Sequence, residues 1–359
     1  MNRQRPQLPS STEKVQQLKG LIGNSPRVLI FTHDNPDPDS MAGALCLAHM
    51  VDQLGLSKPR IAYGGLIGRA ENRYMVEALE IPLWSVDNIK FRPDDVCIAV
   101  DTQPGFGNNS VPEDANVVAV LDHHAPHDGL RGQLVDIRPD YGAVTTIATE
   151  YLLSAGAELS PRLATAICYG ISSETQDLGR QAADADIAAF LEAFPVSDQP
   201  LLGRLHHPQR TPAFFADLQR AINAARVAGE VLICHIPDVS TSETVAEMAD
   251  MLVDVQGIQW ALCTGDYGDK LVLSLRARNQ DARAGQLLRD VVGEPHLAGG
   301  HGMIAGGSIP LDDDNPADQV RDRLTSRLLE ELGLKPNAEL TPLTKLPGVP
   351  GKPGGGTKS

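Results

Sequence analysis

The stretch RVLIFTHDNPDPDS, residues 27–40, carries the strongest indications of fold and chemistry in the chain. It opens with an apolar run at residues 28–31, which is typical of a buried parallel strand. His33, Asp37 and Asp39 come directly after this strand, and the intervening prolines exclude a helix and stiffen the loop. A long amphipathic helical run follows. A strand, an acidic loop and a helix in this order place side chains at the carboxyl end of a parallel sheet.

Helix capping is the ordinary explanation for an acidic residue after a strand, and Asp39 or Ser40 could serve that purpose alone. Three metal-competent groups within seven residues need more than a cap, because no basic residue lies between them. Bare carboxylates at this spacing would repel, and a bound cation removes that repulsion better than solvent does. We therefore expect a metal site in this loop.

The composition limits the classes of protein to which the chain can belong. Its 359 residues suffice for two domains, and a net charge of −15 argues against a protein that coats long nucleic acids. No apolar run approaches the roughly 18 residues of a membrane span, and the polar N-terminus has no signal-peptide core. The five cysteines lie in apolar runs without CxxC spacing, which favours reduced core residues. We expect a cytoplasmic protein with no membrane partner.

Acidic residues and histidines follow two further strands. Asp101 comes after the apolar run 96–100, and Asp122, His123 and His124 come after the next one. Two adjacent histidines on a strand-to-loop turn point in different directions, so at most one is expected to be a direct ligand. A histidine pair alone is more often part of a surface than of a site. As the third such cluster at a strand end, however, this pair supports a shared site.

Strands and helices alternate over residues 12–195, which predicts a parallel α/β sheet with its loops gathered along one edge. One more carboxylate is expected there from SSETQDLGR, where Glu174 and Asp177 are both candidates. The resulting set has four carboxylates, two imidazoles and no thiolate, which suits Mn²⁺ or Mg²⁺ better than structural Zn²⁺. It is larger than one ion needs and suits two ions ~3.5–4 Å apart, with the central Asp101 as the bridge. Its members are His33, Asp37, Asp39, Asp101, His123 and either Glu174 or Asp177.

A second, smaller α/β domain is expected over residues 231–335, after a helical interdomain segment at 196–230. Within it, AGGHGMIAGGSIPL places five glycines around His301, and glycine-rich turns bring backbone amides close to an anion. Arg276 belongs to the same domain and, like His301, can donate to phosphate oxygens. The last residues, 336–359, are rich in Pro, Gly and Lys and are expected to be disordered.

The chain resembles the DHH phosphoesterase superfamily in five stretches that occur in the family's order: HDNPDPDS, VDTQPG, LDHHAP, GISSETQDLG and GGHGMIAGG. The last of them is similar to the DHH-associated C-terminal domain. Within the superfamily, the chain looks most like the nano-RNase/pAp phosphatase group. Its members are Mn²⁺-dependent enzymes that hydrolyse short oligonucleotides and the 3′-phosphate of adenosine 3′,5′-bisphosphate (pAp). The resemblance implies a DHH catalytic domain with a parallel sheet at residues 10–195, and a smaller α/β substrate-binding domain across a cleft.

The resemblance also implies a role for each residue that matches a motif. His33 and Asp37 would bind one Mn²⁺, and Asp39 and His123 would bind the other. Asp101 would bridge the two ions.

Further roles concern the last metal ligand and the substrate. Glu174 falls on the Asp of the family's fourth motif. Asp122 would orient its neighbours, and His124 would lie close to the scissile phosphate. The residues implied to hold the distal phosphate or terminal nucleotide of the substrate are Arg276, Gly299, Gly300 and His301.

Two departures from the family pattern affect the substrate more than the reaction class. Glu174 is longer than Asp by one methylene, for which Asp177 could compensate, and Ala125 and Pro126 follow the DHH triplet where relatives often carry a basic residue. We predict an Mn²⁺-dependent phosphoesterase for short oligonucleotides or pAp-like nucleotides, with Mg²⁺ as a substitute ion. The alternatives are an exopolyphosphatase with the same metal centre and, after it, a non-catalytic nucleotide-binding module. Formation of a homodimer is left open.

Overall fold

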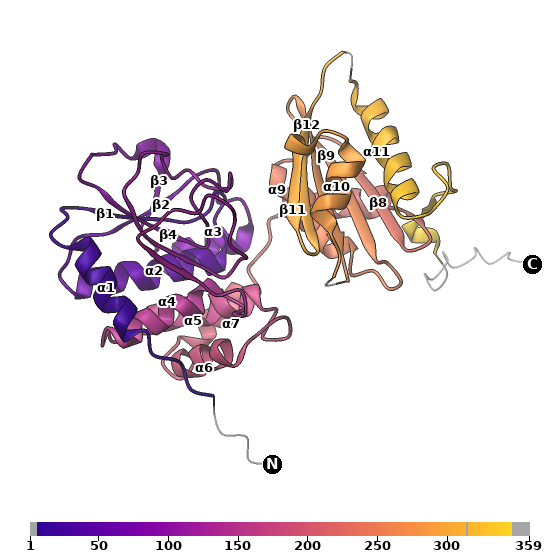
Figure 1. Ribbon diagram of the computed structural model, residues 1–359. Coiled ribbons are helices and arrows are strands. Elements are labelled where there is room, and N and C mark those ends of the chain that lie inside the picture. The colour runs from indigo at the N-terminus through magenta and orange to yellow at the C-terminus, as the bar shows by residue number, and fades with distance from the viewer. Residues whose placement is uncertain (1–5, 280, 314, 347–359) are drawn as a thin grey trace, which may run out of the picture. The chain divides into compact units, whose positions relative to one another are not determined.

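The computed structural model describes residues 6–279, 281–313 and 315–346. The chain forms two compact units, which divide between Gln209 and Arg210 (Figure 1). Each unit has its own sheet and its own buried core. The predicted pair of α/β domains is therefore confirmed, whereas the cleft between them stays a prediction.

The first unit is built on six parallel strands, as the alternation of apolar runs and helices predicts. Their order across the sheet is β3-β2-β1-β4-β5-β6. The chain therefore runs from β1 to the edge strand β3, returns to form β4 on the other side of β1, and continues to the opposite edge at β6. Such a reversal leaves the loops after β1 and β4 beside each other, at the position where open α/β sheets bind ligands. The strands are β1 (Val28–Phe31), β2 (Arg60–Tyr63), β3 (Leu83–Ser85), β4 (Val96–Val100), β5 (Val117–Asp122) and β6 (Leu134–Ile137).

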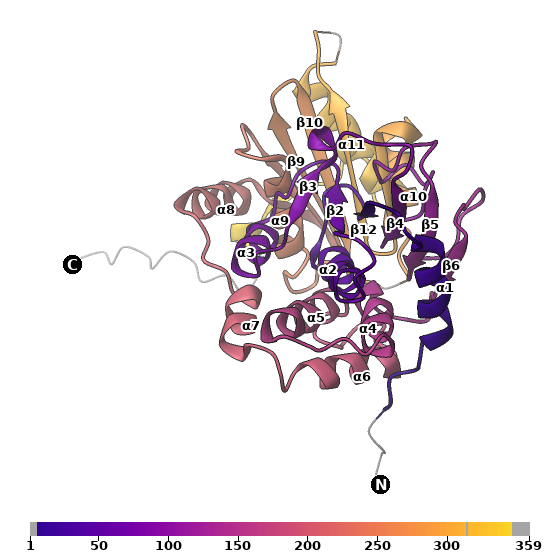
Figure 2. The same cartoon turned by 90° about the vertical axis from the view of Figure 1, so that its left-hand side faces the viewer.

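Helices cover one face of this sheet, and loops cover much of the other. The larger core joins the sheet to helices α2, α4 and α5, which Figure 2 shows grouped together below the strands. A smaller core on the opposite face packs Phe31 and Ala99 against loop residues such as Val111 and Leu130. The helices of the unit are α1 (Thr12–Ile22), α2 (Pro38–Gln53), α3 (Ala70–Ala78), α4 (Val144–Ser154), α5 (Pro161–Glu174), α6 (Asp184–Ala193) and α7 (Gln199–His206), with the short 3-10 helix η1 (Val86–Asn88).

The second unit is a mixed seven-stranded sheet in the order β11-β12-β10-β9-β8-β7-β13. Strands β8 and β9 pair in parallel, and the other described pairs are antiparallel. Helices α8 and α9 pack on one face, and α10 and α11 pack on the other. The strands are β7 (Arg226–Ala228), β8 (Val231–Ile236), β9 (Trp260–Tyr267), β10 (Lys270–Ala277), β11 (Ala298–His301), β12 (Ile304–Pro310) and β13 (Thr341–Pro342). The helices are α8 (Pro212–Ala224), α9 (Ser242–Leu252), α10 (Ala284–Val292) and α11 (Ala317–Glu331), with the 3-10 helices η2 (Pro295–Leu297) and η3 (Leu343–Lys345).

Two expectations about segment boundaries need correction. The predicted interdomain segment 196–230 contains α7, α8 and the strand β7, and it is not a linker, because α7 buries Leu202 and Leu205 in the first unit and α8 buries Ala221 in the second. The predicted disordered tail also begins too early. Residues 341–345 form β13, which pairs with β7, and then η3, which lies against α8. The remainder of the predicted tail, 347–359, lies outside the described residues.

All five cysteines are buried and none forms a disulfide, as their apolar surroundings predict. Within the described residues, the search for a helix long and apolar enough to cross a membrane finds none.

Candidate metal centre

The loop between β1 and α2 places two of the predicted ligands. Asp37 is the N-cap of α2, where its Oδ1 accepts a 2.9 Å hydrogen bond from the amide of Ser40. The Ser40 hydroxyl bonds back to the amide of Asp37 at 3.1 Å, which completes a capping box. The cap therefore lies at Asp37, two residues before Asp39, the earlier of the two candidates from the sequence. Its second oxygen, Oδ2, remains available and lies 3.5 Å from His33 Nε2.

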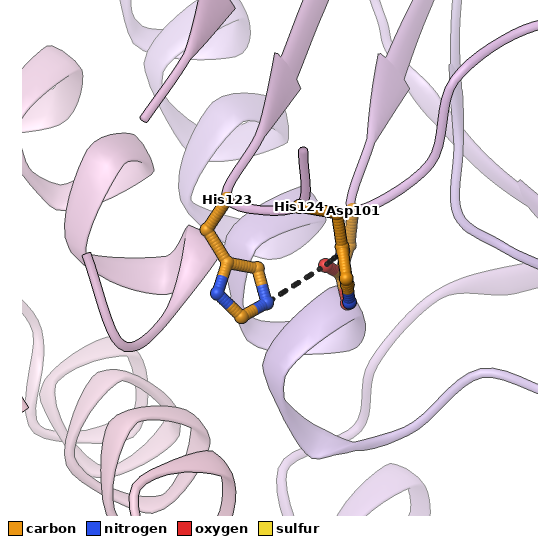
Figure 3. Close-up of side chains that lie close together, drawn as sticks. All are labelled: Asp101, His123 and His124. Atoms are coloured by element: carbon orange, nitrogen blue, oxygen red, sulfur yellow. Dashed lines mark ion pairs between the residues drawn. The ribbon is translucent and has the colours of Figure 1, made fainter. Parts of the chain in front are cut away.

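Asp101 lies between two histidines at the end of β4. Its Oδ2 is 3.7 Å from His33 Nε2. Its Oδ1 is 3.4 Å from His123 Nε2 (Figure 3). The backbone of Asp101 has φ 59°, in the left-handed region that side chains other than glycine rarely adopt, and such strain is concentrated at functional sites. Its Oδ1 is buried and has no hydrogen-bond partner among the described residues. A buried carboxylate oxygen in this position needs a positive partner.

The two adjacent histidines after β5 are held in different ways. The Nδ1 of His123 lies 3.2 Å from the carbonyl oxygen of Tyr141, which leaves Nε2 to face Asp101. His124 instead lies with its Nδ1 2.9 Å from Asp122 Oδ1. Gln103 donates a 2.8 Å hydrogen bond to the other oxygen of Asp122. Figure 3 shows the ring of His123 directed at Asp101, with His124 beside that carboxylate.

Asp39 is almost fully buried, at 1% exposure, and is fixed by the first turn of α4. Its two oxygens accept hydrogen bonds from the amides of Val144 and Thr145, at 2.8 and 2.9 Å. Its Oδ2 also lies 3.8 Å from His123 Nε2. Amides at a helix N-terminus stabilise a carboxylate, so α4 acts as an outer support for this position.

Glu174 and Asp177, the alternatives for the last carboxylate, have different surroundings. Burial and the charges of Asp37 and Asp101 raise the pKa of Glu174 to about 7. The carboxyl group of Glu174 therefore interacts electrostatically with the predicted metal ligands. The side chain of Asp177 is 81% exposed and lies 4.0 Å from His206 instead. This difference follows from a left-handed turn after α5, in which three consecutive residues, 176–178, have positive φ. The geometry therefore favours Glu174.

The charges of the cluster are mutually dependent. Burial lowers the pKa of His33, but the charge and hydrogen bond of Asp37 and the charge of Asp101 outweigh it and raise that pKa to about 10. For His123, the opposing effect of burial is likewise exceeded by the neighbouring carboxylates of Asp101 and Asp39, and its pKa is raised well above the usual value. Burial and the charge of Asp101 raise the pKa of Asp39. Without another positive charge, the site therefore holds protons that a divalent cation would displace.

Residues 27–171 match the model described as the DHH family, N-terminal domain. Over this unit the chain is therefore similar to the DHH family. The chain is 30% identical over 318 residues to an uncharacterized protein of Methanocaldococcus jannaschii, covering 86% of this chain and 64% of the relative. It is 32% identical over 99 residues to a probable manganese-dependent inorganic pyrophosphatase of Shouchella clausii, covering 28% of this chain and 31% of the relative. It therefore spans less than two thirds of the length of either relative.

The fold of the chain matches a solved structure over both units. The crystal structure of an exopolyphosphatase-related protein from Bacteroides fragilis superposes with a TM-score of 0.69 at 12% identity, over 89% of this chain and 96% of the other. This likeness shows the α/β fold alone, with a parallel sheet in the first unit and a mixed sheet in the second. Membership of the nano-RNase/pAp phosphatase group stays a prediction.

The donors gathered in the first unit fit two divalent ions. There are two groups of three side chains, and within each group all the ligand atoms lie within 4.8 Å of one another. Asp101 belongs to both groups. One consists of His33, Asp37 and Asp101, and the other of Asp101, His123 and His124. Oxygen and imidazole donors without thiolate suit Mn²⁺ or Mg²⁺. A metal ion bound at Asp101 would also provide a partner for its buried Oδ1, which has no hydrogen bond among the described residues.

The predicted substrate-binding residues lie in the second unit, where one of the expectations changes. Arg276 is only 6% exposed, pairs with Asp250 and donates 2.8 Å to Ser274 Oγ, so its guanidinium is already engaged inside the unit. Gly299 and Gly300 lie in β11 and pair with β12, so the glycine-rich stretch forms a β-hairpin, which lies beside α10. His301 ends β11, and its side chain lies outside the described part of the structure.

Several residues that support the centre were not identified from sequence. Gln103, two positions after Asp101, orients Asp122, and its place in VDTQPG is a signal that could have been used. Asp186, on α6, is fully buried and accepts hydrogen bonds from Gly142 and Thr146. Nothing in the local sequence distinguishes Asp186 from a helix-capping residue.

Proposed function

We propose that this chain is a metal-dependent phosphoesterase that uses two Mn²⁺ ions to hydrolyse short oligonucleotides or pAp-like nucleotides. The observation that supports it most is the placement of Asp101, whose two oxygens face His33 and His123 at 3.7 and 3.4 Å. A carboxylate with one oxygen directed at each of two ligand groups is arranged to bridge two ions. The manganese dependence in the name of the Shouchella clausii relative supports the choice of ion.

In this proposal each predicted ligand keeps the role assigned above. His33 and Asp37 hold one ion, and Asp39 and His123 hold the other. The remaining ligands are Asp101, as the bridge, and Glu174. When bound, such a pair of ions supplies a hydroxide near neutral pH and neutralises charge on the phosphoryl oxygens.

His124 and Asp122 act on the substrate side of the centre. Asp122 fixes the Nδ1 of His124 at 2.9 Å, so Nε2 is the ring nitrogen that would be presented to a phosphoryl oxygen. Burial lowers the pKa of His124, but its hydrogen bond to Asp122 and the charge of Asp101 exceed that effect and raise it. A protonated imidazole can donate a charge-assisted hydrogen bond to the phosphate. Gln103 completes this arrangement by holding the other oxygen of Asp122 at 2.8 Å.

The test is turnover of the dinucleotide pApA and of pAp by the full chain with Mn²⁺. We expect hydrolysis by the wild type, its loss in Asp101→Ala, and its retention in Asp177→Asn, because that side chain is 81% exposed. Absence of turnover in the wild type with either Mn²⁺ or Mg²⁺ contradicts the proposal, and so does full activity in Asp101→Ala.

Exopolyphosphatase activity at the same centre is the second candidate. It is favoured by the pyrophosphatase name of the Shouchella clausii relative, because pyrophosphate and polyphosphate share the phosphoanhydride bond. A competition assay separates the two candidates. If polyphosphate is turned over faster than pApA and pAp when all are present, the second candidate replaces the first.

A further inference from the structure

Two apolar side chains of the first unit are unusually exposed. Leu66 and Phe106 have exposed fractions of 61% and 60%, the highest of the large hydrophobic side chains among the described residues. Scattered exposed hydrophobic residues are normal on protein surfaces, so exposure alone indicates no function. The positions of these two side chains are more informative.

The loops that carry Leu66 and Phe106 are both attached to the same dipeptide, Asp34–Asn35. The amide of Leu66 donates a 2.9 Å hydrogen bond to Asn35 Oδ1, and the amide of Asn35 donates to the carbonyl of Gly64 at 3.0 Å. On the other side, the amide of Asp34 donates to the carbonyl of Asn108 at 2.7 Å. This dipeptide lies between His33 and Asp37, so both loops are fixed to the metal-binding loop itself.

Phe106 is also held in place by contacts with Gln103 and His127. Its amide donates a 3.0 Å hydrogen bond to the carbonyl of Gln103, and its ring lies 5.4 Å from the ring of His127. The amide of His127 donates to Gln103 Oε1 at 3.0 Å. Gln103 in turn holds Asp122, so the position of the Phe106 ring is coupled to the catalytic histidine loop. An aromatic ring held this way is a pre-ordered surface, which loses little conformational entropy when it binds a ligand.

We infer that Leu66 and Phe106 form an apolar rim that contacts a nucleobase of the substrate whose phosphate lies at the metal centre. Apolar faces offer nothing to an inorganic polyphosphate, whereas every nucleobase has a π-face that stacks on aromatic side chains without sequence preference. The inference rests on the proposed function and deepens it by assigning the residues that distinguish nucleotides from phosphate chains.

The experiment compares pApA with an abasic analogue of the same dinucleotide, using the full chain and Mn²⁺. We expect Phe106→Ala to lower kcat/KM for pApA about 10-fold, within the range of base–aromatic stacking, and to leave the abasic analogue unchanged. Leu66→Ala should have a smaller effect in the same direction, and Phe106→Trp should retain activity. Phe215→Ala is the matched control, because Phe215 is 58% exposed but lies on α8 of the second unit.

The outcomes separate the rim from the phosphoesterase. Equal losses on both substrates overturn the inference and assign Phe106 to the fold of the first unit. An unchanged kcat/KM for pApA overturns it as well. If the wild type hydrolyses neither substrate, the proposed function fails. The rim is then judged by calorimetric binding of AMP and of ribose 5-phosphate with Mn²⁺, where Phe106→Ala should weaken only AMP.

Discussion

The amide of Thr145 donates a 2.9 Å hydrogen bond to the carboxylate of Asp39, although 106 residues separate them in the sequence. The hydroxyl of Thr145 also donates to the Asp39 carbonyl at 2.9 Å. The first turn of α4 therefore holds both the side chain and the backbone of a predicted metal ligand on α2. An element that carries no proposed ligand of its own thus controls the geometry of the centre.

Asp186 should control this support and, through it, the affinity for metal. It accepts hydrogen bonds from Gly142 and Thr146, at 2.7 and 2.5 Å, on either side of the amides that hold Asp39. We expect Asp186→Ala to weaken Mn²⁺ binding by about 10–100-fold, as loss of an outer support usually does. Calorimetric titration of the metal-free chain measures the affinity.

Two further variants make the Asp186 test specific. Asp186→Asn keeps the shape and one acceptor oxygen, so it should lie between the wild type and Asp186→Ala. Asp184→Ala is the control, because Asp184 is an exposed acidic residue in the first turn of the same helix. Wild-type affinity in a folded Asp186→Ala chain would show that α4 needs no such support.

Glu174 and Asp177 can be separated by matched amide substitutions. We expect Glu174→Gln to weaken one of two Mn²⁺ ions by about 10-fold or more, because its carboxyl responds to the charges of Asp37 and Asp101. Asp177→Asn should leave both ions in place, since its side chain is 81% exposed. Metal content after dialysis, together with calorimetry, gives the stoichiometry of each variant. The reverse pattern would assign the last ligand to Asp177.

The part of the centre that the sequence predicts follows from the topology of parallel sheets. Their strands must end at one edge, so His33, Asp101 and His123 could be expected to meet without any knowledge of side-chain contacts. The supports of the centre were missed because they are backbone groups, such as the carbonyl of Tyr141, or a buried carboxylate such as Asp186. Backbone donors and acceptors occur at every position and leave no sequence signal.

The expectations for the second unit were less successful for a related reason. A cation in a strand can face solvent or the interior, and the sequence around Arg276 did not show that its guanidinium is buried and paired with Asp250. The glycines at 299 and 300 also have two explanations. They can cradle an anion, or they can allow a close approach of chains. A Cβ at Gly300 would lie 2.2 Å from the carbonyl oxygen of Ile304, so the close approach of β11 to β12 accounts for Gly300.

Binding of Mn²⁺ should release protons, and the number released should depend on pH. His33 has a pKa raised to about 10 and that of His123 is also raised, so both imidazoles carry a proton near neutral pH and must lose it to bind metal. Glu174, with a pKa of about 7, is mostly protonated at about pH 6 and mostly ionised at about pH 8. Affinity should therefore rise with pH, and about one proton fewer should be released at pH 8 than at pH 6.

Calorimetry in buffers of different ionisation enthalpy counts these protons. Glu174→Gln is the control, because it should remove the difference between the two pH values while the histidines continue to release theirs. A proton count that stays constant in the wild type across this range would contradict the assignment of Glu174 to the centre.

Gly170 should be essential for the packing of α5 against α2 and α4. A Cβ at this position would lie 2.7 Å from Thr145 Oγ1, 2.8 Å from Ala42 Cβ and 3.2 Å from the carbonyl oxygen of Pro38. Ala42 Cβ and the Pro38 carbonyl oxygen are fixed to the backbone of α2, so they can make room only if the whole helix shifts. Gly170→Ala should therefore lower the free energy of unfolding by about 1–3 kcal/mol. Gly20→Ala, where no atom lies within 4 Å, should instead raise it by up to about 1 kcal/mol. Urea denaturation of the metal-free chain measures both changes.

Mn²⁺ affinity should fall only in the Gly170 variant, because the displaced α4 carries the amides that hold the metal ligand on α2. A Gly170→Ala chain with unchanged stability and affinity would show that the three helices can separate without disturbing the centre.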